Sequence, residues 1–219
     1  MSEEQKVKTI FTGHKEYLEK SFLEELNYKI WSTKGARFEA DKRLTIVAKM
    51  SNISLSILSA YLIIASLISV YNLHSEIKIE LINYVVTALS ILLLVLSQYE
   101  NAQNYSLRAK DFHNCGLELS SLYNQLRLFK TLNPNSTENE KREFAIKLSQ
   151  EYQNVLARYE NHISIDYDNF KLAHLEYFKN VTTNEKILIQ TRNFLIRYFW
   201  YSIIIVFTPI LIICLCIFI

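Results

Sequence analysis

Glycine, proline and cysteine are scarce in this chain of 219 residues, which has three Gly, two Pro and three Cys. Because Gly and Pro supply most tight turns, their scarcity argues against a fold of many β-hairpins and favours long helices joined by few turns. The near-absence of Gly also excludes a phosphate-binding loop. The cysteines have neither zinc-site nor disulfide-framework spacing, and we interpret Cys115, Cys214 and Cys216 as small buried hydrophobes.

Catalytic motifs are absent as well. The sequence contains no H-E-x-x-H, no C-x-x-C and no Gly-x-Ser-x-Gly. Asp166 and Asp168 are two apart, so on a helix their carboxylates would diverge, and we do not expect acid–base or metal chemistry from them. His113 and His162 lie in or beside apolar stripes, where a hydrogen-bonded core histidine is the more common role. We therefore predict no enzyme, no metal and no cofactor.

Net charge is nearly balanced, at +2, which argues against nucleic-acid binding through bulk charge. What the chain does have is three long uncharged runs, Met50–Leu73, Leu81–Tyr99 and Tyr198–Ile219. A helix needs about 20 such residues to cross a bilayer core. Core helices of a soluble protein can be this apolar, but three in one small chain favour a membrane. We predict an all-α membrane protein with an N-terminal transmembrane hairpin, long cytosolic helical extensions and a third, C-terminal hydrophobic helix.

Lysine and arginine near the ends of the runs predict the orientation. Lys42, Arg43 and Lys49 precede the first run, and Arg108 and Lys110 follow the second, whereas the connection 72–80 has only Lys78 beside two glutamates. This predicts a membrane protein with a cytoplasmic N-terminus and a cytoplasmic bundle over 101–196. The C-terminus would be periplasmic if the third run spans.

Four regions follow from this pattern. We predict a cytosolic N-terminal helical region at 1–50, a two-span hairpin at 51–100, a cytosolic bundle at 101–180, and a linker helix with the C-terminal span at 181–219.

Residues 14–49 should be mainly helical and continue into the first span. The second span should likewise continue out of the membrane. Asn133–Ser136 should end that helix, and Thr137 with Glu140 forms a capping box that opens the next. A further helix is expected at about 166–180, then one from about Glu185, kinked at Pro209.

Beyond the second span, apolar residues alternate three and four apart, as in a coiled-coil seam. The candidate cytosolic assembly seam consists of Tyr105, Phe112, Gly116, Leu119, Tyr123 and Leu126. A similar stripe from Ala145 to His162 should pack on it. The seam has two interpretations, an antiparallel hairpin inside one subunit or a coiled coil between subunits.

Polar residues form one stripe along each of the first two spans. On the second span these are Asn83, Thr87, Ser90 and Ser97, and on the first they are Asn52, Ser56, Ser59 and Ser66. The stripes could face each other within one hairpin as helix-packing contacts. In an oligomer, the second stripe could instead line a water path closed by dewetting at an apolar layer such as Leu94. Our hypothesis is the second alternative.

Three segments carry a resemblance: KIWSTKGARFEADKRL at 29–44, NYSLRAKDFHNCGLELSSLYNQL at 104–126, and EYQNVLARYENHISIDYD at 151–168. Together they resemble the SLATT family of two-span membrane effectors (SMODS and SLOG-associating), and most closely its fifth subgroup. The resemblance implies an effector of a bacterial antiviral conflict system. Such an effector would oligomerise and permeabilise the inner membrane when triggered, so that the cell stops growing or dies. The third hydrophobic run departs from the two-span pattern.

Partners follow from this resemblance. We expect contact with the lipid bilayer, a homo-oligomer, and a protein from a neighbouring gene, such as a nucleotide-signal synthase or sensor or a reverse transcriptase; direct nucleic-acid binding is not expected. The alternative function is a non-pore membrane anchor or scaffold that tethers a partner enzyme through its cytosolic helices. Toxicity on triggering would separate an effector from an anchor.

Overall fold

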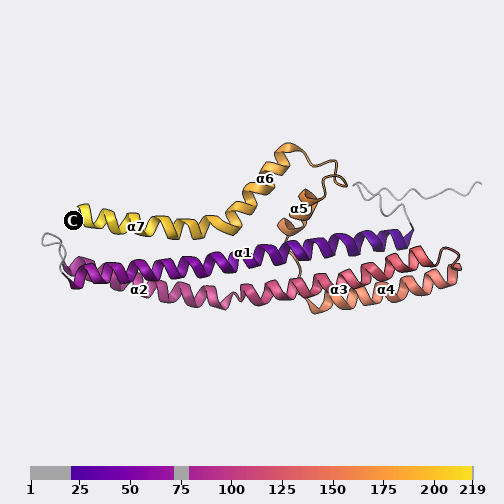
Figure 1. The fold of residues 1–219 in the computed structure, drawn as a ribbon, viewed down its shortest axis with the longest axis horizontal. Coiled ribbons are helices and arrows are strands. Elements are labelled where there is room, and N and C mark those ends of the chain that lie inside the picture. Colours follow the sequence, from indigo (N-terminus) through magenta and orange to yellow (C-terminus); the bar gives the residue numbers. More distant parts are fainter. Residues whose placement is uncertain (1–20, 72–78, 219) are drawn as a thin grey trace, which may run out of the picture.

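A computed structural model describes residues 21–71 and 79–218. In these ranges all regular structure is helical, and the helices run along one elongated body (Figure 1). The helix α1 (Phe22–Val70) is the longest, with 49 residues, and at about 1.5 Å per residue it is roughly 74 Å long. It contains no proline, and its only glycine is Gly35. The predicted continuation of the N-terminal region into the first span is confirmed, while residues 14–20 lie outside the described part.

Two helices continue from the far end of α1 back along its length. They are α2 (Ile79–Ala102) and α3 (Tyr105–Leu132). We predicted one uninterrupted helix here, and that prediction is wrong. Asn104 adopts the left-handed conformation, with φ 50° and ψ 37°, which ends α2 and restarts the chain as α3. Asparagine tolerates this conformation better than most residues with a side chain, so a single Asn suffices for the break.

The helix α4 (Glu138–Arg158) begins where the sequence predicted. The Thr137 hydroxyl accepts the Glu140 backbone N–H, and the Glu140 carboxylate accepts the Thr137 backbone N–H at 2.7 Å, which confirms the capping box. The α4 stripe packs on α3 as expected, and the Phe129 and Phe144 rings stack at 4.0 Å. Both helices also pack on α1, a third partner that we did not predict. The main core joins Leu26 and Ile30 of α1 with residues of α3 and α4.

The last elements are α5 (Ser164–Ala173), α6 (Thr183–Phe194), the π-helical turn η2 (Leu195–Phe199) and α7 (Trp200–Phe218). The helix α5 ends at Ala173, short of the predicted end near 180. A second capping box, Thr182 with Glu185, starts α6 two residues before the predicted Glu185. The helix α7 passes through Pro209, and the clear change of direction lies between α6 and α7, at η2 (Figure 1). A π-turn is a known cause of helix bends.

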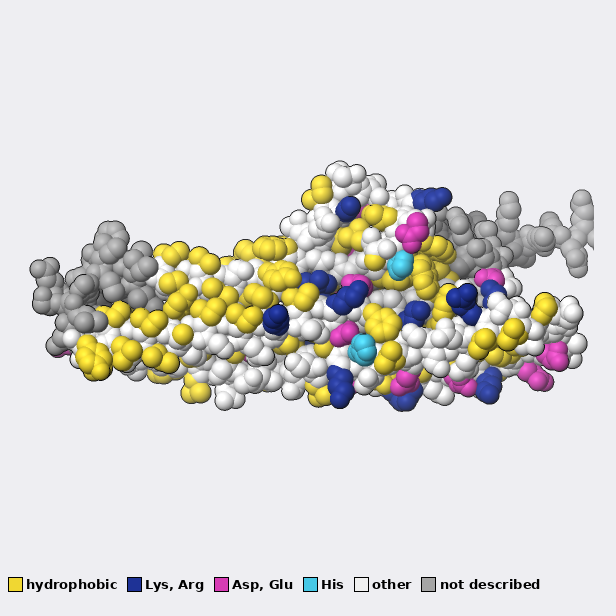
Figure 2. Space-filling model, in the orientation of Figure 1, with side chains coloured by type: hydrophobic (Ala, Val, Ile, Leu, Met, Phe, Trp, Pro, Cys, Tyr) yellow, Lys and Arg dark blue, Asp and Glu magenta, His cyan; other side chains and the backbone are white. Residues whose placement is uncertain are grey.

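Apolar and charged side chains occupy different halves of the body. In Figure 2 the end that holds α2 and α7 is covered by apolar side chains, and the end that holds α3, α4 and α5 carries most of the charged ones. We call these the apolar half and the charged half. The helix α1 passes through both and lies between α2 and α7 in the apolar half (Figure 1). This division follows the placement of uncharged runs in the sequence.

At Gly35 the Phe170 ring of α5 lies close against the backbone of α1. A Cβ atom at this position would overlap the ring of Phe170, a buried residue of α5. Alanine is favoured over glycine inside a helix by about 1 kcal/mol, but overpacking a core costs about 1–3 kcal/mol. We therefore expect Gly35→Ala to lower the free energy of unfolding, measured by denaturant titration in mild detergent. In a Phe170→Ala background the same change should be neutral or stabilising. Stabilisation by Gly35→Ala in the parent chain would contradict this contact.

Candidate functional site

Among the residues that the structure describes, three helical stretches are long and apolar enough, by length and composition, to cross a membrane: one in α1, one in α2 and one in the run from α6 to α7. Their burial differs strongly. The apolar stretch of α1 is partly buried because α2 and α7 pack on it, whereas no described side chain of α2 is buried. The described side chains of α2 and α7 therefore leave broad apolar faces for lipid or for other protein chains.

The predicted polar stripe of α1 lies mostly outside the contact between α1 and its neighbours. Asn52, Ser56 and Ser66 are exposed, and Ser59 is half-buried. The Ser56 and Ser59 hydroxyls donate to carbonyl oxygens of their own helix, at 2.8 Å each. The inward face is instead formed by a set offset around the helix: Ser51, Ser54, Leu58, Leu62, Ala65 and Ser69. We missed this set, although Leu44, Ser51, Leu58 and Ala65 recur every seven residues.

The polar stripe of α2 is also directed outward. Asn83, Thr87 and Ser90 are exposed in the single chain, and Ser97 is half-buried. The Thr87, Ser90 and Ser97 hydroxyls donate to the carbonyls of Asn83, Val86 and Leu94 at 2.7–2.9 Å. Only Asn83 bonds to α1 among the described residues, accepting from the Ser69 hydroxyl at 2.6 Å. The four positions therefore present one amide and three hydroxyls on a free helix face. Each of these hydroxyls already donates to a backbone carbonyl of α2.

The candidate assembly seam lies inside the chain. Phe112, Gly116, Leu119 and Leu126 are buried, and the half-buried Tyr105 and Tyr123 pack beside them. Gly116 allows the Phe38 ring of α1 to approach, since a Cβ atom there would come within 2.7 Å of it. These side chains are occupied by contacts with α1 and α4. Contact between subunits through the same residues would require the bundle to open. Cys115 beside them is fully buried, as we predicted for a small hydrophobe.

A buried ion pair joins α5 to α1. The Arg43 guanidinium donates twice to the Asp166 carboxylate, from Nε to Oδ1 at 2.7 Å and from Nη2 to Oδ2 at 3.1 Å. Asp166 is 0% exposed, and it also accepts the Ile163 backbone N–H at 3.1 Å. Such a two-pronged arginine–carboxylate contact fixes orientation as well as distance. Asp166 thus holds the start of α5 against the middle of α1, a role that its spacing from Asp168 did not predict.

A second buried arginine lies six residues earlier on α1. Arg37 is 1% exposed, and its guanidinium donates to the Glu160 backbone carbonyl and, at 3.1 Å, to the Asn161 side-chain oxygen. Both acceptors lie in the connection between α4 and α5. Arg37 occurs seven residues after Ile30 and seven before Leu44, so it is in register with the buried stripe of α1. A charged residue in register with a buried apolar stripe needs buried hydrogen-bond partners. This is the feature of the sequence that could have indicated the junction.

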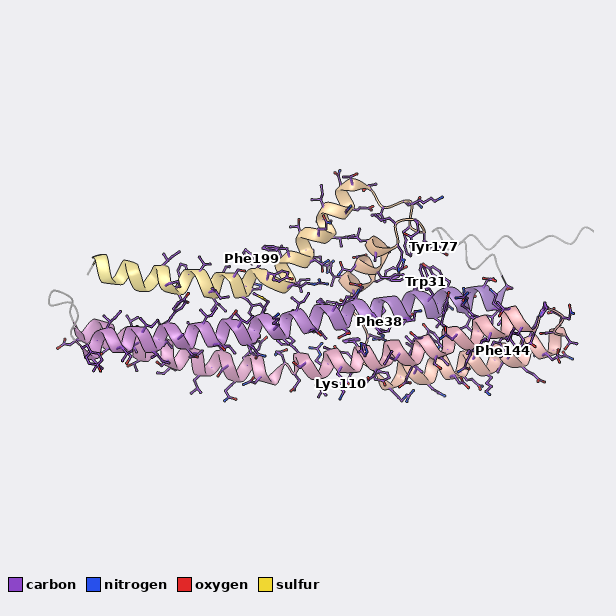
Figure 3. The ribbon with its side chains drawn as sticks, viewed as in Figure 1. Trp31, Phe38, Lys110, Phe144, Tyr177 and Phe199 are labelled. Carbon is purple, nitrogen blue, oxygen red and sulfur yellow. The ribbon has the colours of Figure 1, made fainter. Side chains whose placement is uncertain are left out.

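Aromatic side chains extend the α1–α5 contact. Trp31 of α1 lies 4.8 Å from the Phe170 ring of α5 and 5.0 Å from the Tyr177 ring, measured between ring centroids. Figure 3 places Trp31 and Tyr177 together where the α5 segment meets α1. Edge-to-face aromatic contacts of this kind add to the stabilisation from burial. The arginine, aspartate and aromatic contacts together make the α1–α5 junction.

The chain from α5 to α7 links this junction to the apolar half. The Asn169 side chain of α5 donates to Asn193 of α6 at 2.9 Å. Farther along, the Tyr201 hydroxyl of α7 donates to the Glu100 carboxylate near the end of α2, at 3.0 Å. Tyr201 is buried, whereas the other described side chains of α7 are exposed or half-buried. A displacement of α5 would therefore act on α7 and on the end of α2.

One known protein family matches nearly the whole length of this chain. Residues 19–215 match the family described as SMODS and SLOG-associating 2TM effector domain family 5. The chain belongs to this family. No curated protein and no solved structure matches it. The resemblance in the three sequence segments is thus confirmed for the SLATT family and its fifth subgroup, whose description is that of an effector domain.

The extent of the match bears on the third hydrophobic helix. The matched region ends at residue 215, inside α7, and so includes α5, α6 and most of α7. The description counts two transmembrane segments, whereas this SLATT chain has three stretches that meet the length and composition of a span. The α1–α5 junction and the exposed α2 stripe both lie within the matched residues.

We expect His162 to give the α1–α5 junction a dependence on pH. Its Nδ1 atom is buried without a hydrogen-bond partner in the described structure. Burial lowers the pKa of His162, the nearby Arg37 cation lowers it further, and Asp166 opposes them. The folded state therefore takes up this proton less readily than the unfolded state, which titrates near the ordinary histidine pKa of about 6.5. Stability contributed by neutral His162 is present above that value and is lost as pH falls through the lowered pKa.

The test compares the parent chain with His162→Gln. We expect thermal stability in detergent to fall on acidification from about pH 7 to pH 5, and to fall less steeply in the variant because glutamine does not titrate. Carboxylates contribute equally to both curves, so the difference between them reports His162. Two parallel curves would contradict a buried neutral histidine at the junction.

Proposed function

We propose that this SLATT chain is a membrane effector of a bacterial antiviral conflict system, which oligomerises and permeabilises the inner membrane when triggered. Membership of an effector family and three span-length apolar stretches support the setting. The observation that carries the proposal is the outward polar stripe of α2. Only one of its four side chains bonds to α1, so the stripe is free to meet copies of itself.

The stripe suits an uncharged water path. In an oligomer with α2 innermost, the hydroxyls of Thr87, Ser90 and Ser97 line the path, and Asn83 lies at its outer end. No charged residue occurs from Leu81 to Tyr99, so the path would select weakly between ions. Leu94 is 60% exposed and lies on the same side of α2, where a ring of leucines would close the path by dewetting.

The resting state in this proposal is the structure described above. The α1–α5 junction holds the charged half as one bundle, and η2 and α7 pack along α1. A partner protein from a neighbouring gene, such as a nucleotide-signal synthase or sensor or a reverse transcriptase, acts on the bundle. Release of α5 would free α7 from α1 and let the exposed α2 stripes of several copies come together. The proposed orientation keeps the charged half in the cytoplasm, because Lys and Arg near the first two spans concentrate there.

The experiment follows membrane integrity in cells that express the chain with and without its neighbouring gene, before and after phage infection. A voltage-sensitive dye reports depolarisation and propidium iodide reports larger breaches. Depolarisation that requires the trigger is the expected result. Intact membranes and normal growth at high, membrane-localised expression under the same conditions would reject the effector and favour an anchor that tethers a partner enzyme.

A further inference from the structure

A groove runs between α1 and α3 close to the border of the two halves. Its volume is about 590 Å³. The α1 side contributes Lys49 and Asn52, and the α3 side contributes Ser106 and Lys110. Figure 3 labels Lys110 on α3 close to the start of that helix, beyond the break after α2. The groove is separate from the α2 stripe and from the α1–α5 junction.

The groove carries a net positive charge. Lys49 and Lys110 are both exposed, and neither has an ion-pair or hydrogen-bond partner among the residues that the structure describes. The one carboxylate in the lining, Asp41, is already occupied. It accepts from the Thr45 hydroxyl at 3.2 Å and pairs with His113 Nδ1 at 3.0 Å. Two unpaired ammonium groups beside hydroxyl and amide donors form a surface that binds an anion, and a phosphate is their common ligand.

The position of the groove indicates whether its ligand is a free phosphate or the phosphate of a lipid. Lys49 is the last charged residue before the uncharged run of α1, so an anion here lies where that helix passes from the charged to the apolar half. The groove is also lined by Ala48, Ile53 and Ala109, which contact the apolar part of a ligand. A phosphate attached to acyl chains satisfies both halves of the lining, whereas a free phosphate satisfies only the polar half.

We propose that the α1–α3 groove binds the phosphate headgroup of an anionic phospholipid. Lys49 and Lys110 contact the phosphate from opposite walls, with Asn52 and Ser106 as neutral donors. The acyl chains continue along the apolar face of α1. A bound lipid bridges α1 and α3 close to the break at Asn104. Binding does not depend on permeabilisation, so the two proposals can fail separately.

The test measures lipid retention by native mass spectrometry on the full chain purified in neutral detergent. Phosphatidylglycerol is titrated against phosphatidylcholine of the same chain length, and inorganic phosphate serves as a third ligand. We expect phosphatidylglycerol to bind most tightly. The Lys49→Gln, Lys110→Gln double variant should weaken that binding roughly 10- to 30-fold, since each lysine near an anionic lipid contributes about a fivefold factor.

The matched control removes two exposed lysines elsewhere, in the double variant Lys147→Gln, Lys186→Gln. It changes net charge equally and should leave lipid affinity within about twofold. An equal loss in both double variants would overturn the groove in favour of bulk charge. No loss in the Lys49, Lys110 variant would overturn it outright. Phosphate that binds as tightly as the lipid, or displaces it at equal concentration, would overturn the assignment to a lipid.

Discussion

Cells that produce the Thr87→Leu, Ser90→Leu double variant are expected to keep their membrane potential when triggered, while cells with the parent chain depolarise. Both hydroxyls are exposed on α2 and bond to the backbone of their own helix, so their replacement removes no hydrogen bond to another helix. Two added leucines would extend the apolar layer of Leu94 along the proposed path and keep it dry. We expect the rate of dye-reported depolarisation to fall at least tenfold.

The matched control is Ala88→Leu. Ala88 is exposed on the same helix and adjacent to Thr87, but it lies about 100° farther around the helix. It adds the same side chain at the same membrane depth, outside the polar stripe. Parent-like depolarisation is expected for this control. Equal loss in both variants would point to a general defect of α2, and parent-like leakage in the double variant at normal expression would reject the lining.

Asp166→Asn is expected to lower the stability of the α1–α5 junction by about 3–5 kcal/mol. Asparagine keeps nearly the same shape and an acceptor for the Ile163 N–H, but it leaves the Arg43 cation buried without an anion. The measurement is the denaturant dependence of Trp31 fluorescence in a Trp200→Phe background, because Trp31 contacts Phe170 of α5. The chain has two tryptophans, so this background isolates the junction.

The control for this prediction removes the stranded charge. In the Arg43→Met, Asp166→Asn double variant no ion remains at the position, and buried pairs replaced by neutral groups are often close to neutral in stability. We expect the double variant to recover most of the loss. A single variant as stable as the parent chain, or a double variant less stable than Asp166→Asn, would contradict the buried pair as the contact that holds α5.

Under the proposed function, Asp166→Asn should also change the growth of cells. If the α1–α5 junction keeps the effector silent, Asp166→Asn should lower the trigger requirement and slow growth of uninfected cells. Recovery of growth in the double variant would link the effect to the stranded charge. Parent-like growth of Asp166→Asn, with the stability loss confirmed, would place the silencing contact elsewhere in the bundle.

Local chemistry made parts of the fold predictable from sequence. The capping box of Thr137 and Glu140 and the unbroken course of α1 depend on residues a few positions apart. The end of α2 was not predictable in the same way, because the left-handed Asn104 has no proline or glycine beside it to mark the break. The end of α5 at Ala173 likewise has no sequence breaker and is set by tertiary contacts.

The candidate site shows a similar limit. Helical periodicity groups Asn52, Ser56 and Ser59 on a stripe, but the face directed inward depends on where α2 and α7 pack, and Ser51 and Ser54 occupy it instead. The contact of Asp166 with Arg43 joins residues 123 positions apart. No spacing rule connects them. Only the register of a charge with the buried stripe of α1 indicates that a partner must exist.

Accessibility of position 90 to water decides whether the α2 stripe lines a water path or faces lipid and protein. A cysteine is placed at Ser90 or, as control, at Ala88, in a chain whose three native cysteines are changed to alanine and which still depolarises cells. A membrane-impermeant, positively charged thiol reagent is then added before and after triggering. The account predicts that Ser90→Cys reacts, and that the reaction slows ion leakage, only after triggering, while Ala88→Cys stays unreactive in lipid. Equal reactivity at the two positions, or none at Ser90→Cys in cells that depolarise, would contradict a water path lined by the α2 stripe.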